Sequence, residues 1–247
     1  MEDQYSRTRL LLGQAALDRL RRSRVAVFGV GGVGGYAVEA LARSGVGRLD
    51  LIDSDRVSLS NLNRQIIALH STVGQYKVDA AAARVKDIDP TIEVRTYKVF
   101  YTPETADRFD FSQYDYVVDA IDTVTGKLAL AERARQAGVP ILSCMGAGNK
   151  LNAAAFEVAD ISKTAMCPLA RIMRKELRKR GIAHLKVVYS QEEVLPPLEE
   201  IGTEGQRRPV PGSAAFVPGA AGLIAAGEVV KDLTADERAA ARREERP

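Results

Sequence analysis

The residues best suited to chemistry begin with a glycine-rich loop. The loop, G-V-G-G-V-G at residues 29–34, follows the apolar run 25–28 and precedes a helical pattern. Glycines at 29, 31 and 34 allow a tight turn, close approach of the backbone to a phosphate, and close packing of a helix on a strand. The first turn of the helix then offers amide hydrogens to an anion. The loop therefore predicts an anion-binding turn.

An acidic residue follows where a nucleotide ribose would lie. Asp53 ends the next apolar run, 48–52, and its carboxylate can accept hydrogen bonds from a ribose diol. The strand, loop, helix and acid together predict a nucleotide-binding site. The alternative is a structural glycine turn with a surface aspartate. The motif alone leaves open whether the nucleotide is NAD or ATP.

The segment after Asp53 favours ATP. In a dehydrogenase the chain would continue from the ribose acid into a helix, whereas here residues 53–65 carry a polar cluster of Ser60, Asn61, Arg64 and Gln65. Lys77 follows near the start of the next helix. Guanidinium and ammonium groups near the loop suit a triphosphate, whose charge must be neutralised during attack. Taken singly, both cations could be ordinary surface charges.

Alternating patterns must position these residues. Runs typical of strands cover 25–28, 48–52, 92–99, 114–121 and 139–143, and helical patterns cover 8–22, 35–44, 75–88 and 125–137. This alternation predicts an α/β fold: a Rossmann-like, doubly wound, mostly parallel sheet over residues 20–150, with helices on both faces.

The rest of the chain is less regular. We expect strands at 154–158 and 186–189, helices at 168–180 and 219–233, a proline-rich loop at 191–212, and a charged, flexible tail at 234–247. The core and the extension 151–233 are expected to form one domain, 1–233.

Composition limits the class of protein. The 247 residues are 46% hydrophobic and 27% charged, with a net charge of +3, which is ordinary for a soluble globular protein and compatible with nucleic acid. The amino-terminal residues have no apolar signal region, and no apolar run is long enough for a membrane span. The cysteines, Cys144 and Cys167, form no C-x-x-C pair, so we expect neither a disulfide framework nor a zinc site. A reducing cytoplasm fits this usage.

The polar segment also carries a family resemblance. The motif D-x-D-x-V-x-x-S-N-L-N-R-Q at residues 53–65, followed by V-G-Q-x-K at 73–77, resembles the E1-like activating superfamily. Its members include the molybdopterin and thiamin biosynthesis adenylyltransferases. The resemblance covers residues 5 to about 150. It implies that the chain is an enzyme that uses ATP to adenylate a carboxylate.

The resemblance implies roles for named residues. Gly32 and its neighbours hold phosphate, Asp53 holds the ribose, Asn61 and Arg64 contact the triphosphate, and Lys77 stabilises charge at the α-phosphate. The full set expected to bind the nucleotide is Gly29, Gly31, Gly32, Gly34, Asp53, Asp55, Ser60, Asn61, Arg64, Lys77, Asp122 and Thr123.

Two further roles depend on the resemblance. Asp122 matches the acid that holds Mg²⁺ with ATP, and Arg7 matches an arginine supplied to the ATP site of the partner subunit, which implies a homodimer with shared sites. Arg7, Arg64, Lys77 and Asp122 are thus the expected catalytic set. As alternatives, Asp122 could cap the helix that begins near Thr125, and Arg7 could lie in a disordered segment. Asp55 is either a second acid of the site or a turn residue, and Asp119 is expected to be structural.

The second half resembles one branch of the superfamily. Segments 143–150, 156–164, 171–180 and 212–219 are similar to the tRNA threonylcarbamoyladenosine dehydratases, which extends the resemblance to about residue 233. These enzymes activate the carboxylate of N6-threonylcarbamoyladenosine (t6A) at position 37 of tRNA, and ring closure then removes water. The nucleophile belongs to the substrate, so no enzyme cysteine is required. We expect Cys144 to be a core residue. Cys167 precedes a helix, where its thiol pKa could be lowered.

A basic stripe is the candidate RNA contact. Arg171, Arg174, Lys175 and Arg178 share one face of the predicted helix 168–180. Such a stripe is often just a solvated surface, but in a protein that holds an anticodon stem it can contact phosphates.

Two alternatives remain open. The first is an adenylyltransferase that activates a ubiquitin-like sulfur-carrier protein. The second is a non-catalytic E1-like subunit or an NAD-binding protein, which the presence of Arg64, Lys77 and Asp122 disfavours. The sequence does not reveal which tRNAs are used, whether a monovalent cation (Na⁺ or K⁺) binds near Ala147 and Gly148, or whether a sulfurtransferase or cysteine desulfurase partner exists.

Overall fold

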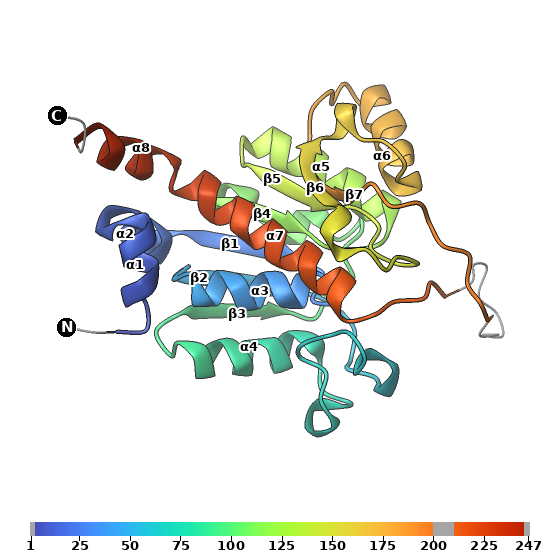
Figure 1. The fold of residues 1–247 in the computed structure, drawn as a ribbon, viewed down its shortest axis with the longest axis horizontal. Coiled ribbons are helices and arrows are strands. Elements are labelled where there is room, and N and C mark those ends of the chain that lie inside the picture. The colour runs from blue at the N-terminus through green and yellow to red at the C-terminus, as the bar shows by residue number, and fades with distance from the viewer. Residues whose placement is uncertain (1–2, 200–209, 245–247) are drawn as a thin grey trace.

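One seven-stranded sheet organises the molecule, a computed structural model that describes residues 3–199 and 210–244 (Figure 1). The strand order is β3-β2-β1-β4-β5-β7-β6. Neighbouring strands are parallel except for β6, which runs antiparallel to β7. The strands are β1 (Arg24–Phe28), β2 (Arg48–Ile52), β3 (Glu93–Tyr97), β4 (Tyr116–Asp119), β5 (Ile141–Cys144), β6 (Phe156–Asp160) and β7 (Lys186–Ser190).

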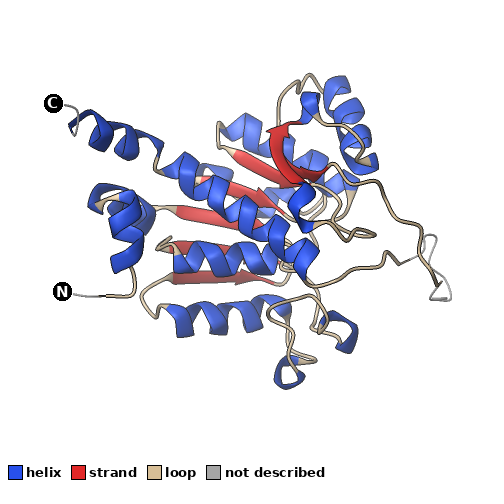
Figure 2. Ribbon diagram, viewed as in Figure 1, coloured by secondary structure: helices blue, strands red, loops and turns tan. Residues whose placement is uncertain are grey.

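Helices cover both faces of this sheet (Figures 1 and 2). The helices α3, α4 and α7 lie on one face, and α5 and α6 lie on the other. The bounds are α1 (Ser6–Leu12), α2 (Gln14–Arg22), α3 (Gly34–Arg43), α4 (Lys77–Ile88), α5 (Val124–Ala137), α6 (Pro168–Lys179), α7 (Phe216–Leu233) and α8 (Ala235–Glu244). The expected doubly wound α/β fold is confirmed, and β6 and β7 extend the same sheet.

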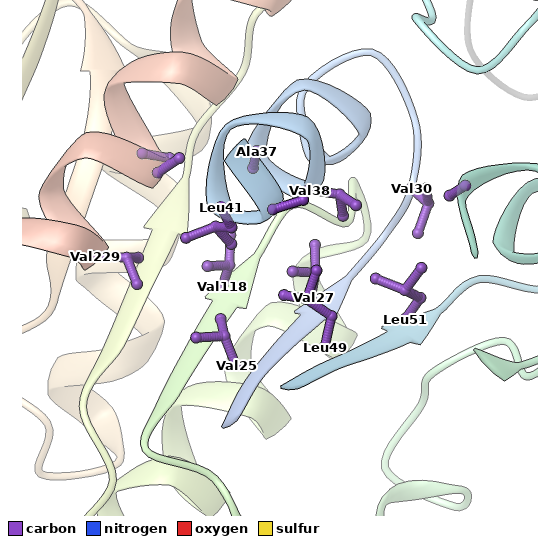
Figure 3. Close-up of a cluster of buried hydrophobic side chains, with 14 of the residues drawn as sticks. Val25, Val27, Val30, Ala37, Val38, Leu41, Leu49, Leu51, Val118 and Val229 are labelled. Atoms are coloured by element: carbon purple, nitrogen blue, oxygen red, sulfur yellow. The ribbon is translucent and has the colours of Figure 1, made fainter. Parts of the chain in front are cut away.

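Alternation along the strands builds a core on each face. Val25 and Val27 of β1 point toward α3, where they meet Leu41 in the cluster drawn in Figure 3. Ala26 and Phe28, the residues between and after them, point to the opposite face. Because successive side chains of a strand point to opposite faces, an unbroken apolar run is what a strand covered on both sides requires.

The crossing of α3 and α7 is unusually close. A Cβ added at Gly222 would lie 2.2 Å from the carbonyl oxygen of Val33 and 2.9 Å from Cβ of Tyr36. Gly219 also faces the Tyr36 ring. The last long helix is therefore packed directly on the helix that follows the glycine loop.

Two elements differ from the sequence-based expectation. The helix expected over 8–22 is two helices, because Gly13 adopts φ = 85° between them, a backbone conformation that glycine tolerates. The tail expected to be flexible contains α8, whose alanine, glutamate and arginine residues have high helix propensity. Arg238 of α8 donates hydrogen bonds to the Thr234 hydroxyl and the Lys231 carbonyl, which link it to the end of α7.

Among the described residues, no helix is long and apolar enough to cross a membrane.

Candidate active site

A cavity of about 450 Å³ lies at the carboxyl ends of the parallel strands. In open α/β sheets, ligands bind in the crevice outside this edge. Its walls include the glycine loop, residues 52–55, residues 120–123, residues 147–148, and Val210, Pro211 and Ser213. The chain thus brings segments far apart in sequence to one edge of the sheet.

The glycine loop has the conformation that its sequence predicts. Gly29 has φ = 87°, and a Cβ there would lie 2.7 Å from the carbonyl oxygen of Ala120. At Gly34 a Cβ would lie 1.8 Å from the carbonyl oxygen of Gly29. Larger residues at either position would force the loop off β4 or α3. Gly31 and Gly32 line the cavity, whereas Gly34 supports the loop from behind.

Asp53 links this loop to the end of β2. One carboxylate oxygen accepts a hydrogen bond of 2.8 Å from the amide of Val30, and the other accepts one of 2.8 Å from the amide of Asp55. Each carboxylate oxygen has a second lone pair, so Asp53 can still accept from ribose hydroxyls. Asp53 lines the cavity, and its contact with a ribose stays a prediction.

Lys77 and Asp55 form an ion pair within the cavity wall. The Nζ of Lys77 lies 2.7 Å from a carboxylate oxygen of Asp55, and the Lys77 amide donates to the Asp55 carbonyl at 2.9 Å. The lysine side chain is 8% exposed and the aspartate side chain 61%. Since Lys77 is the first residue of α4, its backbone is fixed by a helix while its ammonium faces the cavity.

The other polar residues of the motif are held by local hydrogen bonds. The Asn61 side chain accepts from the Ser58 amide at 3.1 Å, and Arg64 donates to the Ser60 carbonyl at 2.9 Å. The Ser60 hydroxyl lies 3.0 Å from that of Ser58. Asn61, Arg64 and Gln65 line the cavity, whereas Ser60 is outside its lining.

Gln65 carries an unsatisfied polar atom. It is buried, and its Oε1 has no hydrogen-bond partner among the described residues. A buried acceptor without a partner is costly. Because Gln65 lines the cavity, a hydrogen-bond donor on a bound molecule could satisfy it.

Asp122 and Thr123 occupy the turn between β4 and α5, and both line the cavity. The N-cap position of α5 belongs to Thr123, so Asp122 lies one residue before it and is not the helix cap. Its exposed carboxylate is available to a ligand.

Asp119 has a different setting from Asp122. It is fully buried, and its carboxylate pairs with the buried Lys127 of α5 at 3.0 Å, which agrees with the expected structural role. Lys127 was not among the residues predicted to have a role. Its signal was a lone cation in the small and apolar run 126–131, all of which is buried.

Arg7 and the basic stripe lie away from the cavity. Arg7 is exposed on α1, beside the amino-terminal ends of the strands, and it does not line the cavity of its own chain (Figure 1). Arg171, Lys175 and Arg178 are exposed on α6. Arg174 is instead partly buried, and its Nη1 donates to the Thr164 hydroxyl at 2.6 Å and the Thr164 carbonyl at 2.8 Å.

The two cysteines are buried. Burial raises the pKa of the Cys144 thiol to about 12, so this thiol is neutral near pH 7. Its packing in the core agrees with the expected structural role. Cys167 packs in an apolar cluster with Ala170, Met173 and Leu177 of α6. Among the described residues, no group of three or more histidine, cysteine, aspartate or glutamate side chains could hold a metal ion.

Comparison with known proteins agrees with this geometry. The ThiF family model matches residues 5–244. The tRNA threonylcarbamoyladenosine dehydratase of Bacillus subtilis is 46% identical, covering 96% of both chains, and that of Escherichia coli is 34% identical, covering 94% of this chain and 93% of the relative. The crystal structure of the E. coli dehydratase in complex with ATP matches with a TM-score of 0.86 at 33% identity, covering 97% of this chain and 96% of the other.

The match extends over the glycine loop, the polar segment and the second half of the sheet alike, so this chain belongs to the ThiF family and, within it, to the tRNA threonylcarbamoyladenosine dehydratases.

Proposed function

We propose that this chain uses ATP to activate the carboxylate of t6A at position 37 of tRNA, and that ring closure then removes water. The observation that carries the proposal is one cavity at the carboxyl edge of the sheet that gathers Asp53, Arg64, Lys77 and Asp122. Relatives that match over nearly the whole length bear the dehydratase name. We further propose that residues 1–233 act as one domain, because the extension completes the sheet.

The reaction needs activation because a carboxylate is a poor electrophile. A carboxylate oxygen of t6A attacks the α-phosphorus of ATP, and pyrophosphate leaves. The resulting acyl adenylate has AMP as a good leaving group. A nucleophilic atom of the same threonylcarbamoyl group then attacks the acyl carbon, the ring closes, and AMP departs. Relative to the neutral acid, t6A gives up one oxygen to AMP, the carboxyl proton and the proton of the nucleophile, which together equal one water, so no free water is released.

The cations of the cavity supply most of the chemistry. Lys77 can exchange its contact with Asp55 for the α-phosphate, because the Asp55 carboxylate is 61% exposed and water can solvate it once the contact breaks. Arg64 lies on the same wall and can contact the β- and γ-phosphates. Preorganised cations stabilise charge that develops in the transition state.

Asp122 is the residue that would hold Mg²⁺. Sites of this kind bind the ion through one or two carboxylates and the substrate phosphates, so a single exposed carboxylate beside the glycine loop fits. When bound, Mg²⁺ would offset negative charge on the phosphates. The thiols of this chain need not take part, since the nucleophile is on the substrate.

We also propose that the chain acts as a homodimer. Arg7 belongs to α1, which lies beside the amino-terminal ends of the strands (Figure 1), and it does not line the cavity of its own chain, so a contribution to ATP binding would have to reach the cavity of a second copy. For tRNA, Arg171, Lys175 and Arg178 are exposed and suited to phosphate contacts, whereas Arg174 has an intramolecular partner. Copurification from cells tests for a sulfurtransferase or cysteine desulfurase partner.

The direct test is nucleoside analysis. Purified protein is incubated with Mg-ATP and tRNA carrying t6A, and the digested nucleosides are weighed by mass spectrometry. We expect t6A to lose one water while AMP and pyrophosphate form. Asp122→Ala should lower the rate by at least about 100-fold. Asp236→Ala, which removes an exposed carboxylate on α8, is the matched control and should leave the rate unchanged.

The sulfur-carrier alternative predicts a different result. An unchanged t6A mass, together with pyrophosphate exchange that depends on a small protein ending in Gly-Gly, would contradict the dehydratase proposal. It would leave the adenylation site intact.

A further inference from the structure

Lys127 stands at the centre of a buried hydrogen-bond network. Its Nζ lies 3.0 Å from Oδ1 of Asp119, 3.4 Å from the Ser143 hydroxyl, and 2.7 Å from the carbonyl oxygen of Cys144. The Ser143 hydroxyl donates to the other carboxylate oxygen of Asp119 at 2.5 Å. An ammonium group has three donors, so these contacts use all of them.

This network joins two walls of the cavity. Asp119 ends β4, accepts a 3.3 Å hydrogen bond from the Ile121 amide, and leads into the turn that carries Asp122. Cys144 ends β5 and leads to Ala147 and Gly148, which also line the cavity. Lys127 therefore bonds to the last residue of each strand that leads into these two segments, without lining the cavity itself.

Stability alone does not account for this ion pair. Lys127 and Asp119 have side chains that are 0% exposed, and a well-packed apolar pair at such a place is often at least as stable as a buried ion pair. Unlike an apolar pair, the charged pair requires hydrogen-bond partners in defined directions. Lys127 needs a carboxylate, a hydroxyl and a carbonyl at fixed positions, and these groups come from two different strands.

We propose that Lys127 is a positioning residue for the nucleotide site, which fixes the Asp122 turn and the 145–148 segment relative to each other. The proposal rests on the use of Mg-ATP proposed above. Lys127 does not line the cavity, so it acts through Asp122 and not by touching the substrate.

The lead variant replaces both charges. Lys127→Met alone leaves a buried carboxylate without a partner, so it could simply fail to fold. The double variant Asp119→Asn with Lys127→Met removes both charges and keeps the volumes similar. We expect it to fold, with kcat lowered by about 100-fold, because small displacements of a positioned group have effects of this size. The Mg²⁺ concentration that gives half-maximal rate should rise about tenfold while KM for ATP changes little.

Hydrogen exchange gives a readout that does not depend on catalysis. In the double variant without nucleotide, peptides covering 120–123 and 145–148 should exchange at least several-fold faster than in the unmodified protein. Tyr116→Phe is the matched control. It removes a 2.7 Å bond to Asp232 from a buried side chain of the same strand, away from the cavity, and should change neither readout.

The outcomes separate the two proposals. A folded double variant with unchanged exchange in both segments and an unchanged Mg²⁺ requirement would overturn the positioning role. If the double variant does not fold, Ser143→Ala is tested in its place. We expect the exchange rates of the two segments and the Mg²⁺ requirement to change a few-fold in that variant. Unchanged values would contradict the positioning role. If the unmodified protein leaves t6A intact, the dehydratase proposal fails, but the exchange of these segments still decides the role of Lys127.

Discussion

Two lysine–aspartate pairs lie at the carboxyl edge of one sheet, and their surroundings differ. Lys77 meets Asp55 at 2.7 Å in the cavity wall, where the carboxylate is 61% exposed. Lys127 meets Asp119 at 3.0 Å beneath the cavity, where both side chains are 0% exposed. In the outer pair, Asp55 remains in solvent if Lys77 turns to a ligand, whereas the inner pair cannot be separated without leaving a buried charge alone. The same two residue types therefore serve binding in one place and rigidity in the other.

The largest effect is expected from breaking the inner pair on one side. Lys127→Met should lower the free energy of unfolding by about 3–5 kcal/mol, because Asp119 stays buried without a partner. Adding Asp119→Asn should recover most of that loss. Urea unfolding of the single and double variants measures both values. Equal destabilisation in the two variants would show that the contrast between the pairs is not electrostatic.

The outer pair should affect rate and not stability. Lys77→Ala should lower kcat by about 100–1000-fold, the usual effect of losing one preorganised donor to a developing anion, with a melting temperature close to that of the unmodified protein. Lys98→Ala is the control, since Lys98 pairs with Asp79 at 2.8 Å but does not line the cavity. Single-turnover AMP formation checks the rate. If Lys77→Ala kept its rate but had a lowered melting temperature, the outer pair would serve stability and not catalysis, which would contradict this assignment.

Away from the cavity, Glu39 pairs with two arginines, and we expect the effect of removing its charge to be smaller than the two effects above. Glu39 accepts bonds from Arg84 at 2.6 Å and from Arg43 at 2.7 Å. Burial by itself raises the pKa of Glu39, but the hydrogen bonds from both arginines outweigh it, so this pKa lies below its ordinary value of 4.5. A lowered pKa means that the ionised group stabilises the fold above about pH 4.5 and that this contribution fades as the pH falls below that value.

Glu39→Gln should therefore lower the free energy of unfolding by about 1–2 kcal/mol at pH 7. The gap between the two proteins should narrow as the pH falls from 4.5 toward 3. Melting curves of both proteins from pH 7 to pH 3 test this, with Asp236→Asn as an exposed control. A gap that stays constant through this range would mean that the arginines do not act on the ionised form.

The smallest effect is expected at Cys144. Lys127 bonds to the carbonyl of this residue and not to its thiol, so Cys144→Ala keeps the inner network. The thiol pKa of about 12 leaves it neutral at pH 7. We expect kcat to change by less than about twofold, since a buried cysteine acts as a small apolar side chain that alanine largely replaces, and the unmodified enzyme should resist N-ethylmaleimide at pH 7. A loss of most activity on substitution would instead point to a covalent cysteine.

Lys77 could be placed at the site from the sequence, and Asp55 was one of two open possibilities there, whereas the inner pair was not predicted, for a physical reason. Lys77 and Asp55 belong to motifs in which a strand, a turn and a helix start follow one another, so local spacing alone brings them to the same edge. Lys127 finds its partners on β4 and β5, and only the packing of α5 against both strands decides that contact.

The same distinction explains the other differences. The helical spacing on either side of Gly13 continues without interruption, so the pattern hides a break that is decided by one backbone angle. The charge of residues 235–244 suggested a solvated tail, yet their propensities are those of a helix. The stripe on α6 followed from spacing, but Arg174 turns toward Thr164, whose place is set by the tertiary fold.

The close crossing of α3 and α7 has a consequence for biosynthesis. The glycine loop, α3, β1 and β2 leave the ribosome long before α7, whose Gly222 must rest against the Val33 carbonyl before α3 is covered. Until then the apolar side of α3 is exposed to water and to other nascent chains. The α7 side of α3 therefore cannot gain its native cover until the chain has been synthesised beyond Phe216, where α7 begins.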